Sequence, residues 1–133
     1  MTHAAVRYLE SKRSVDDRAL SVPVREALRT SLPESPRILE AGCGTGTMVP
    51  RLVDLGVTAG TYRGVDRDRG VVEFARYARP RELRHRGYAA TTTANGFTLD
   101  RLAATFETGD ALTAFEGDDG ADLFVASSFA DLV

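Results

Sequence analysis

Residues 38–46 read Ile-Leu-Glu-Ala-Gly-Cys-Gly-Thr-Gly, a short apolar run followed by three glycines at alternate positions. Glycine has no Cβ and adopts positive φ easily, so such a loop lets the backbone approach another group closely. The next segment, 47–55, has apolar residues at helical spacing, with Pro50 suited to the first turn and Gly56 placed to end the helix. A strand, a glycine loop and a helix N-terminus in this order predict a site for a nucleotide-like ligand.

The size and composition of the chain limit its class. A chain of 133 residues is expected to form one domain, 1–133, and 43% hydrophobic with 27% charged residues is typical of a globular protein. A net charge of −2 gives no electrostatic argument for nucleic acid, and no apolar run is long enough to span a membrane. The N-terminus lacks an apolar secretory segment, and a single cysteine excludes an internal disulfide. We therefore expect a cytoplasmic protein with no nucleic-acid or membrane partner.

Predicted strands alternate with predicted helices along the chain. The N-terminal part, 1–36, reads as helices followed by a proline-containing loop, and 37–133 as the α/β part. The patterns in the α/β part predict strands at 37–41, 61–66, 105–108 and 121–126 and helices at 47–55, 69–79 and 98–104. Asp68 is placed to cap the second of these helices and Pro80 to end it. The alternation predicts a parallel sheet with right-handed crossovers.

The arginine-containing stretch 79–97 fits none of these elements well. It reads as an insertion, either a substrate-facing arm or a loop without fixed structure. The arginines from Arg76 to Arg86, which begin just before this stretch, are interpreted as a solvated face rather than a site for an anionic substrate or RNA, because the net charge of the chain is negative.

Three acids recur at the predicted carboxyl ends of the first three strands: Glu40, Asp66 and Asp110. Ligands of open α/β sheets bind outside these strand ends. A carboxylate after the second strand can accept hydrogen bonds from both ribose hydroxyls, and one after the third can accept from an exocyclic amine. Each acid alone is more often a cap or turn residue, but their order behind a glycine loop favours a nucleotide-like ligand.

At these positions the sequence resembles the class I S-adenosylmethionine-dependent methyltransferases. Their first motif, an acid followed by alternating glycines, is matched by Glu40, Gly42, Gly44 and Gly46. The second, an acid that ends the next strand, is matched by Asp66, and the third, a Gly-Asp-Ala-like turn, by 109–111. Residues 122–128 resemble the fourth motif of the family, Asp-Leu-x-x-Ala followed by small polar residues. The whole resemblance covers roughly residues 14–133.

This resemblance implies a Rossmann-like parallel sheet with strand order 3-2-1-4, flanked by helices, and S-adenosylmethionine as the cofactor. Glu40 would reach the ammonium group of the cofactor's methionine part. The backbone at Gly42 and Gly44 would pass close to that part, and Cys43 and Gly46 complete the loop.

The remaining cofactor contacts are implied in the same way. Asp66 would hold the ribose hydroxyls, Asp110 would accept from the adenine amine, and the backbone of Ala111 would meet the ring edge. Arg67 stands where the family often has an apolar residue against the adenine face, although a guanidinium can stack on a ring instead. Ser127 either faces the methyl group or closes a strand as a small residue.

No catalytic residue and no metal site are assigned. A sulfonium is already an activated methyl donor, so the main task of such an enzyme is to align the acceptor and exclude water. A general base is needed only when the acceptor is protonated. Cys43 is interpreted as a small residue that tolerates tight packing rather than a nucleophile, because no histidine lies near it in the sequence.

The family's sheet has seven strands in the order 3-2-1-4-5-7-6, and only the first four are predicted here. The fourth strand is then expected to be an apolar, unpaired edge. The interpretation that we favour is a piece of a longer enzyme without the C-terminal strands, and the alternative is a homodimer that pairs along this strand. The acidity of the chain and the lack of an added binding domain favour a small-molecule acceptor.

Two other functions compete with this one. An NAD(P)-dependent oxidoreductase shares the glycine loop, and Asp66 lies 20 residues after Gly46, as that class requires. However, Thr47 stands where its third glycine is needed, and neither Glu40 nor the turn 109–111 has a role there. The other alternative is a non-catalytic module for cofactor binding or dimerisation.

Overall fold

The computed structural model describes residues 30–126. Their helices are α3 (Met48–Asp54), α4 (Arg69–His85) and α5 (Ala111–Ala114). The strands are β1 (Arg37–Ala41), β2 (Ala59–Asp66), β3 (Ala90–Thr92), β4 (Gly96–Leu99), β5 (Arg101–Thr108) and β6 (Leu123–Val125). Most of the predicted N-terminal helices, along with Ser127, lie outside the described residues. None of the described helices is both long and apolar enough to cross a membrane.

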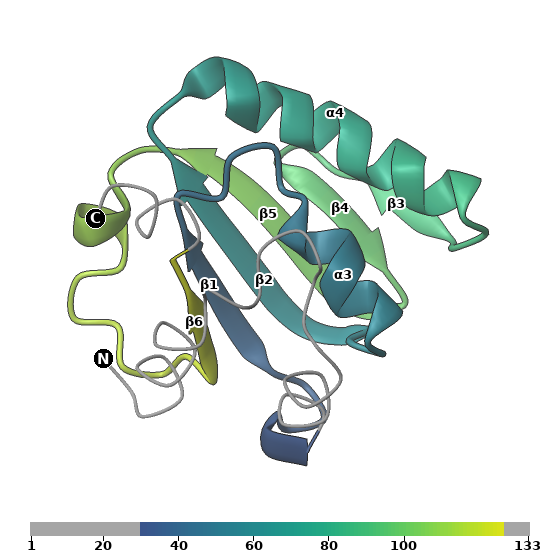
Figure 1. The fold of residues 1–133 in the computed structure, drawn as a ribbon, viewed down its shortest axis with the longest axis horizontal. Coiled ribbons are helices and arrows are strands. Elements are labelled where there is room, and N and C mark those ends of the chain that lie inside the picture. The colour runs from purple at the N-terminus through teal and green to yellow at the C-terminus, as the bar shows by residue number, and fades with distance from the viewer. Residues whose placement is uncertain (1–29, 127–133) are drawn as a thin grey trace.

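The strands form one six-stranded sheet in the order β3-β4-β5-β2-β1-β6. β5, β2, β1 and β6 are parallel to one another, whereas β3 pairs antiparallel with β4, and β4 pairs antiparallel with β5 (Figure 1). The four parallel strands are the four that the sequence predicts, and their order is the expected 3-2-1-4. The α/β class and the Rossmann-like arrangement are therefore confirmed.

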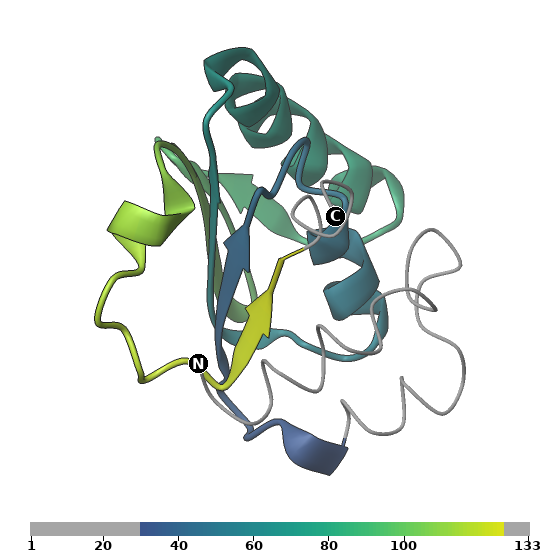
Figure 2. The same cartoon turned by 60° about the vertical axis from the view of Figure 1, so that its left-hand side comes forward.

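The hydrophobic core is divided between the two faces of the sheet. α3 and α4 cover one face, where Tyr62, Phe97 and Phe106 are among the largest buried side chains (Figure 2). The Tyr62 and Phe106 rings pack edge to face, with their centroids 5.7 Å apart. The short helix α5 lies on the other face, where Phe115 packs against Leu39 and Val65 in a smaller cluster.

The ends of α3 and the start of α4 agree with the sequence signals. Pro50 lies in the first turn of α3, and Gly56, at φ 98°, follows its C-cap residue Leu55. The carboxylate of Asp68 accepts hydrogen bonds from the backbone N–H groups of Gly70 and Val71, at 2.9 and 3.2 Å, and so caps α4.

The predicted end of α4 at Pro80 is wrong. The helix continues to His85 and ends where Gly87 adopts φ 96°. Pro80 removes one helical N–H donor, but tertiary packing holds the helix on the sheet. Leu83 is fully buried, and Arg76 donates from Nε to the carbonyl oxygen of Phe106 on β5 at 2.8 Å.

The predicted helix at 98–104 is also wrong, because this segment belongs to β4 and β5. From Arg101 to Glu107, buried residues of β5 alternate with exposed or half-buried ones, which is the period of a strand. Leu99 pairs with Leu102 across a tight turn, in which Asp100 adopts φ 54°. The stretch 79–97 is correspondingly not a loop: it contains the second half of α4, strand β3 and the start of β4.

Polar contacts fix β6 beside β1. The backbone N–H of Arg37 donates to Asp122 Oδ2 at 2.8 Å, and Asp122 N–H donates back to the Arg37 carbonyl at 2.8 Å. The Arg37 guanidinium also forms a two-point ion pair with Asp118. This hydrogen-bonded pair lowers the pKa of the Asp118 carboxyl. Within residues 30–126, no strand pairs with the other side of β6.

The alternation in β4 gives a direct test of the hairpin. Phe97→Ala should lower the free energy of unfolding by about 3–5 kcal/mol, because the Phe97 side chain is buried against Phe106. Thr98→Ala, on the exposed face of the same strand, should change it by less than about 0.5 kcal/mol. Urea unfolding of both variants measures the difference, and comparable losses would contradict the strand.

Candidate functional site

The carboxyl ends of β1, β2 and β5 are adjacent in the sheet, and short backbone hydrogen bonds join them. The carbonyl oxygen of Val65 accepts from the N–H groups of Gly42 and Cys43, at 2.8 and 3.1 Å. On the other side of β2, the N–H of Gly109 donates to the Asp66 carbonyl at 2.9 Å. The structure thus brings the three predicted motifs into one row along this edge of the sheet.

The glycine loop has the backbone conformation that its sequence predicts. Gly42, Gly44 and Gly46 all have positive φ, between 56° and 79°. A Cβ on Gly46 would lie 2.6 Å from the Phe106 ring, so this glycine allows the loop to pack on β5. A Cβ on Gly44 would meet nothing within 4 Å, so the backbone of Gly44 borders open space.

Asp66 connects the loop to β2 through its side chain. Its Oδ2 accepts from the backbone N–H of Gly44 and its Oδ1 from that of Asp68, both at 2.9 Å. Each carboxylate oxygen has two lone pairs, so further donors can still bind. Asp66 therefore positions the loop and keeps acceptor capacity at the edge of the sheet.

Glu40 lies beneath the loop rather than on its surface. Glu40 is only 2% exposed, and no other charged residue among those described is buried. The hydroxyl of Tyr62 donates to Glu40 Oε1 at 2.5 Å. Burial, reinforced by the negative charge of Glu40, raises the pKa of the Tyr62 hydroxyl well above its ordinary value. Tyr62 is therefore a neutral donor at physiological pH.

Gly64 makes room for this hydrogen bond. A Cβ at this position would lie 2.6 Å from the Tyr62 hydroxyl and 2.7 Å from the Cβ of Cys43. Sequence reasoning did not identify Tyr62 or Gly64 as part of the site. The sequence does contain one signal for them: a glycine inside a strand often marks a place where another group approaches the backbone closely, and Gly64 lies inside β2.

Cys43 is buried at 5% exposure and belongs to the core that α3 and α4 cover. Burial is the main cause that raises the pKa of its thiol from 9.0 to about 12, and the charges of Glu40 and Asp66 add to the shift. The thiol is therefore protonated near neutral pH. This environment agrees with a packing role and not with a nucleophile.

Asp110 follows β5 and caps α5. Its Oδ1 accepts from the N–H of Leu112 at 3.0 Å, and its Oδ2 lies 3.5 Å from the guanidinium of Arg67. The Arg67 side chain is 79% exposed and that of Asp110 is 41% exposed, so this ion pair is weak and can separate easily. Ala111, the next residue, is buried.

The predicted site residues thus fall into two groups. Gly42, Gly44, Asp66, Arg67 and Asp110 lie along the carboxyl edge, whereas Glu40, Cys43, Gly46 and Ala111 are buried just below it. Ser127 lies outside the described residues. Within 30–126, no cluster of three His, Cys, Asp or Glu side chains is arranged to hold a metal ion.

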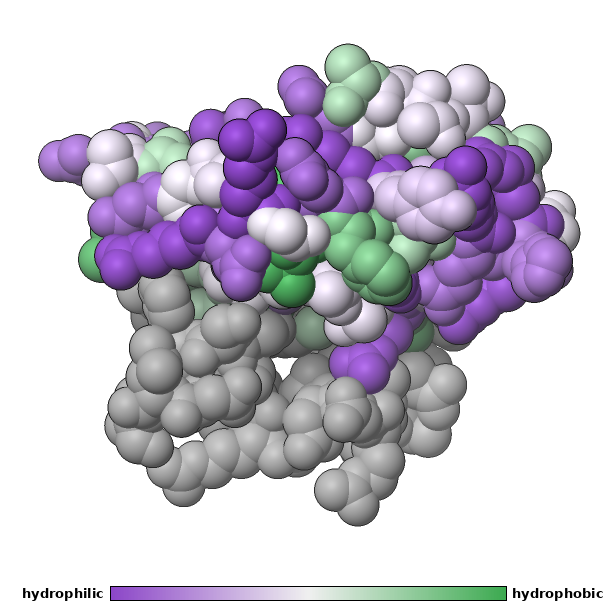
Figure 3. Space-filling view, turned by 90° about the horizontal axis from the view of Figure 1, so that it is seen from above, coloured by the Kyte–Doolittle hydropathy of each residue, from purple (hydrophilic) through white to green (hydrophobic). Residues whose placement is uncertain are grey.

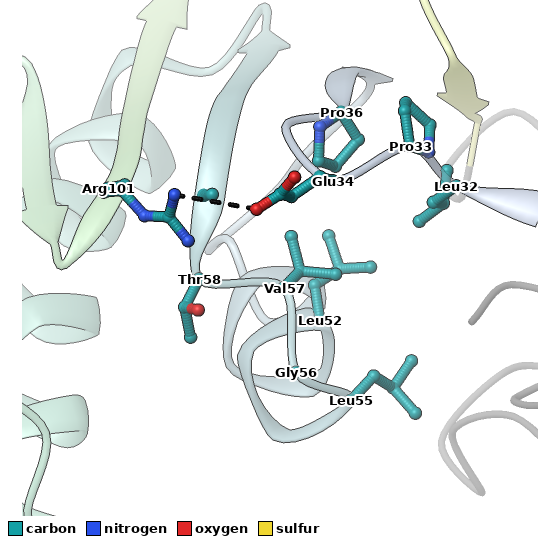
Figure 4. A pocket seen from close by; sticks show the side chains of 11 residues that line it. Leu32, Pro33, Glu34, Pro36, Leu52, Leu55, Gly56, Val57, Thr58 and Arg101 are labelled. Carbon is teal, nitrogen blue, oxygen red and sulfur yellow. Dashed lines mark ion pairs between the residues drawn. The ribbon is translucent and has the colours of Figure 1, made fainter. Parts of the chain in front are cut away.

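A hollow of about 290 Å³ lies at the opposite, amino edge of the sheet. The loop before β1, the end of α3 and the start of β2 line it (Figure 4). Glu34 and Arg101 face one another across it, with their charged atoms 3.8 Å apart. None of the predicted site residues lines this hollow.

Comparisons with known proteins found a distant structural match and no match in sequence. No protein-family model and no curated protein matches the sequence. Among solved structures, a SAM-dependent methyltransferase from Thiobacillus denitrificans, in complex with S-adenosyl-L-homocysteine, matches with a TM-score of 0.44 and 19% sequence identity. The match covers 89% of this chain and 42% of that chain, so this chain spans less than half of that protein's length.

The buried hydroxyl beneath the loop can be tested by removing it. Tyr62→Phe should lower the free energy of unfolding by about 1–3 kcal/mol, because the buried Glu40 carboxylate loses one of its donors. Tyr88→Phe is the matched control, since its hydroxyl contacts Asp54 at 3.2 Å on an exposed part of the surface. Urea unfolding should show less than about 0.5 kcal/mol for this control, and equal losses would contradict the account.

Stability should also fall at alkaline pH. A thiol with a raised pKa holds its proton in the folded state and releases it on unfolding, so its contribution is complete below pH 9 and decreases as the pH rises toward 12. The slope is about 1.4 kcal/mol per pH unit for one proton. Urea unfolding between about pH 8 and 10 should show a smaller decline in Cys43→Ala than in the original chain, and an unchanged decline would contradict the prediction.

Proposed function

We propose that the carboxyl edge of this sheet binds S-adenosylmethionine, and that the chain is the cofactor-binding part of a methyltransferase. The observation that carries the proposal is the row formed by the glycine loop, Asp66 and Asp110. Asp66 hydrogen-bonds to Gly44 at one end of this row, and at the other Arg67 pairs with Asp110. An elongated ligand with a polar tail, a ribose and a base fits such a sequence of groups.

The local geometry suits a ligand of this kind. The backbone at Gly44 borders open space, so a ligand can lie against it without displacing a side chain. The second lone pairs of the Asp66 carboxylate are acceptors for ribose hydroxyls, and Asp110 is an acceptor for an exocyclic amine. Because the Glu40 carboxylate is buried beneath the glycine loop, its role in this proposal is to support the loop and not to present an exposed binding surface to the ligand.

Arg67 and Asp110 would change partners when the ligand binds. In this structure the Arg67 guanidinium occupies the vicinity of Asp110 Oδ2. An adenine amine would compete for that oxygen, and Arg67 would then be free to stack on the ring. Since the pair is exposed, separating it costs about 1 kcal/mol or less.

S-adenosylmethionine, when bound, supplies a methyl group on a positively charged sulfur. The residues of this chain would then have to hold the donor and exclude water from it, which the rigid loop and the buried pair of Glu40 and Tyr62 support. A small-molecule acceptor remains part of the proposal, as does pairing of a second copy along β6. Support for the pairing comes from the open side of β6 within the described residues.

Calorimetric titration of the full chain with S-adenosylhomocysteine, S-adenosylmethionine and NAD tests the proposal. Both sulfur-containing ligands should bind and NAD should not. Tight NAD binding without either of them would favour an oxidoreductase, and no binding of any of the three would favour a non-catalytic module; each outcome would overturn the proposal.

Asp66→Asn should weaken S-adenosylhomocysteine binding by about tenfold or more, because an amide offers one acceptor oxygen where the carboxylate offers two. Asp100→Asn is the matched control: it makes the same change at an exposed turn with φ 54°, a conformation that asparagine tolerates. Its affinity should match that of the original chain. Thermal unfolding of both variants separates a lost ligand contact from a loosened loop, and equal affinities would count against the assigned role of Asp66.

A further inference from the structure

The outward face of α4 carries two aromatic rings in solvent. Phe74 is 51% exposed and Tyr77 is 59% exposed, one helical turn apart. The opposite side of the helix, with Val72, Ala75 and Leu83, is buried against the sheet. Figure 3, which views the side where α4 lies, shows a small apolar patch among hydrophilic residues. Exposed rings on a helix that is otherwise firmly packed point to a contact surface.

Positive charge is concentrated on the same helix. Residues 69–86 contain six arginines and two glutamates, a net charge of +4 with His85 neutral, in a chain whose net charge is −2. The net charge of the whole chain gives no indication of a nucleic-acid partner, because acidic residues elsewhere in the sequence outweigh the positive charge of this segment. Among the described residues, Arg69, Arg79 and the C-cap residue Arg86 form ion pairs, whereas Arg76, Arg81 and Arg84 form none. These three donate to uncharged oxygens instead, Arg76 and Arg81 to backbone carbonyls and Arg84 to the Ala90 carbonyl and Thr92 Oγ1, so no carboxylate neutralises their charge.

The cations and the rings are arranged together. Arg81 lies over the Tyr77 ring, 3.8 Å from its centroid, and the Arg79 guanidinium lies 5.9 Å from the centroid of Phe74. Phe74, Tyr77, Arg81 and Arg84 recur at helical spacing and share one stripe of the helix. No branched aliphatic residue belongs to this stripe, which favours a partner that presents planar rings and negative charge over an apolar protein surface.

We infer that this stripe of Phe74, Tyr77, Arg81 and Arg84 binds single-stranded nucleic acid. Bases stack on Phe74 and Tyr77, and the guanidinium groups of Arg81 and Arg84 contact the phosphates. Stacking of this kind requires unpaired bases, so the stripe discriminates single strands from duplexes. The inference goes beyond the proposed cofactor site and does not depend on it, because none of these four residues belongs to the row of Gly44, Asp66 and Asp110.

The chain contains no tryptophan, so Tyr77→Trp introduces a single fluorescent reporter into the full-length protein. Titration with single-stranded oligo(U) of about 12 nucleotides should quench this fluorescence through stacking. Thr98→Trp, exposed on β4, is the control and should not be quenched. An unquenched Tyr77→Trp with oligo(U) would overturn the inference.

Fluorescence anisotropy with labelled oligo(U) measures which groups carry the affinity. Tyr77→Ala and Phe74→Ala should each weaken binding by about fivefold or more, and Arg81→Gln with Arg84→Gln should reduce its dependence on salt. Arg69→Gln, a paired arginine on the same helix, should have a smaller effect. Because both rings are exposed, the variants should unfold at the original temperature, which circular dichroism checks.

Two other results would also overturn the inference. Equal affinity for a duplex of the same length, or for heparin, with no loss in Tyr77→Ala would indicate general attraction to polyanions. A concentration-dependent dimer that Tyr77→Ala disrupts, without any binding of oligo(U), would show instead that the stripe is a protein interface.

Discussion

The attachment of the glycine loop to β2 determines the geometry of the rest of the site. Val65 accepts two loop N–H groups through its carbonyl, and Asp66 accepts a third through its side chain. These three bonds fix where the chain turns after β1, and therefore where α3 begins. They also require glycine at positions 42, 44 and 46, because each has positive φ. The buried hydrogen bond between Tyr62 and Glu40 supports this attachment from below.

The parallel part of the fold could be predicted from the sequence because its signals are local. Alternating strands and helices, the acid at the end of β2 and the cap at Asp68 each follow from a few neighbouring residues. The antiparallel hairpin could not be predicted in this way. Its strands are short and its turn at Asp100 lacks glycine, so the period of two in β5 was missed. The predicted helix end at Pro80 was wrong because it also rested on a local signal. The burial of Leu83 against the sheet outweighs the helix-breaking effect of the proline.

The candidate site divides along the same line. The row of Gly44, Asp66 and Asp110 was predictable, because each motif ends a strand and parallel strands bring such ends together. The support beneath the row could not be predicted, because it consists of contacts between residues that are distant in the sequence. Tyr62 on β2 contacts Glu40 on β1, and Gly64 on β2 lies against Cys43 in the loop after β1. The concentration of positive charge on α4 could not be predicted from the sequence either. Arg81 and Arg84 lie on the same helix as Phe74 and Tyr77 because α4 continues beyond Pro80 to His85.

In the proposed function, an adenosine-containing cofactor lies along the carboxyl edge, between the glycine loop and Asp110. Nuclear magnetic resonance of the ¹⁵N-labelled chain during titration with S-adenosylhomocysteine tests it most directly. The amide signals of Gly42, Gly44, Arg67 and Ala111 should shift together, while those of Thr58 and Arg101 at the amino edge should not. Shifts confined to the hollow near Arg101, or none at saturating ligand, would contradict it.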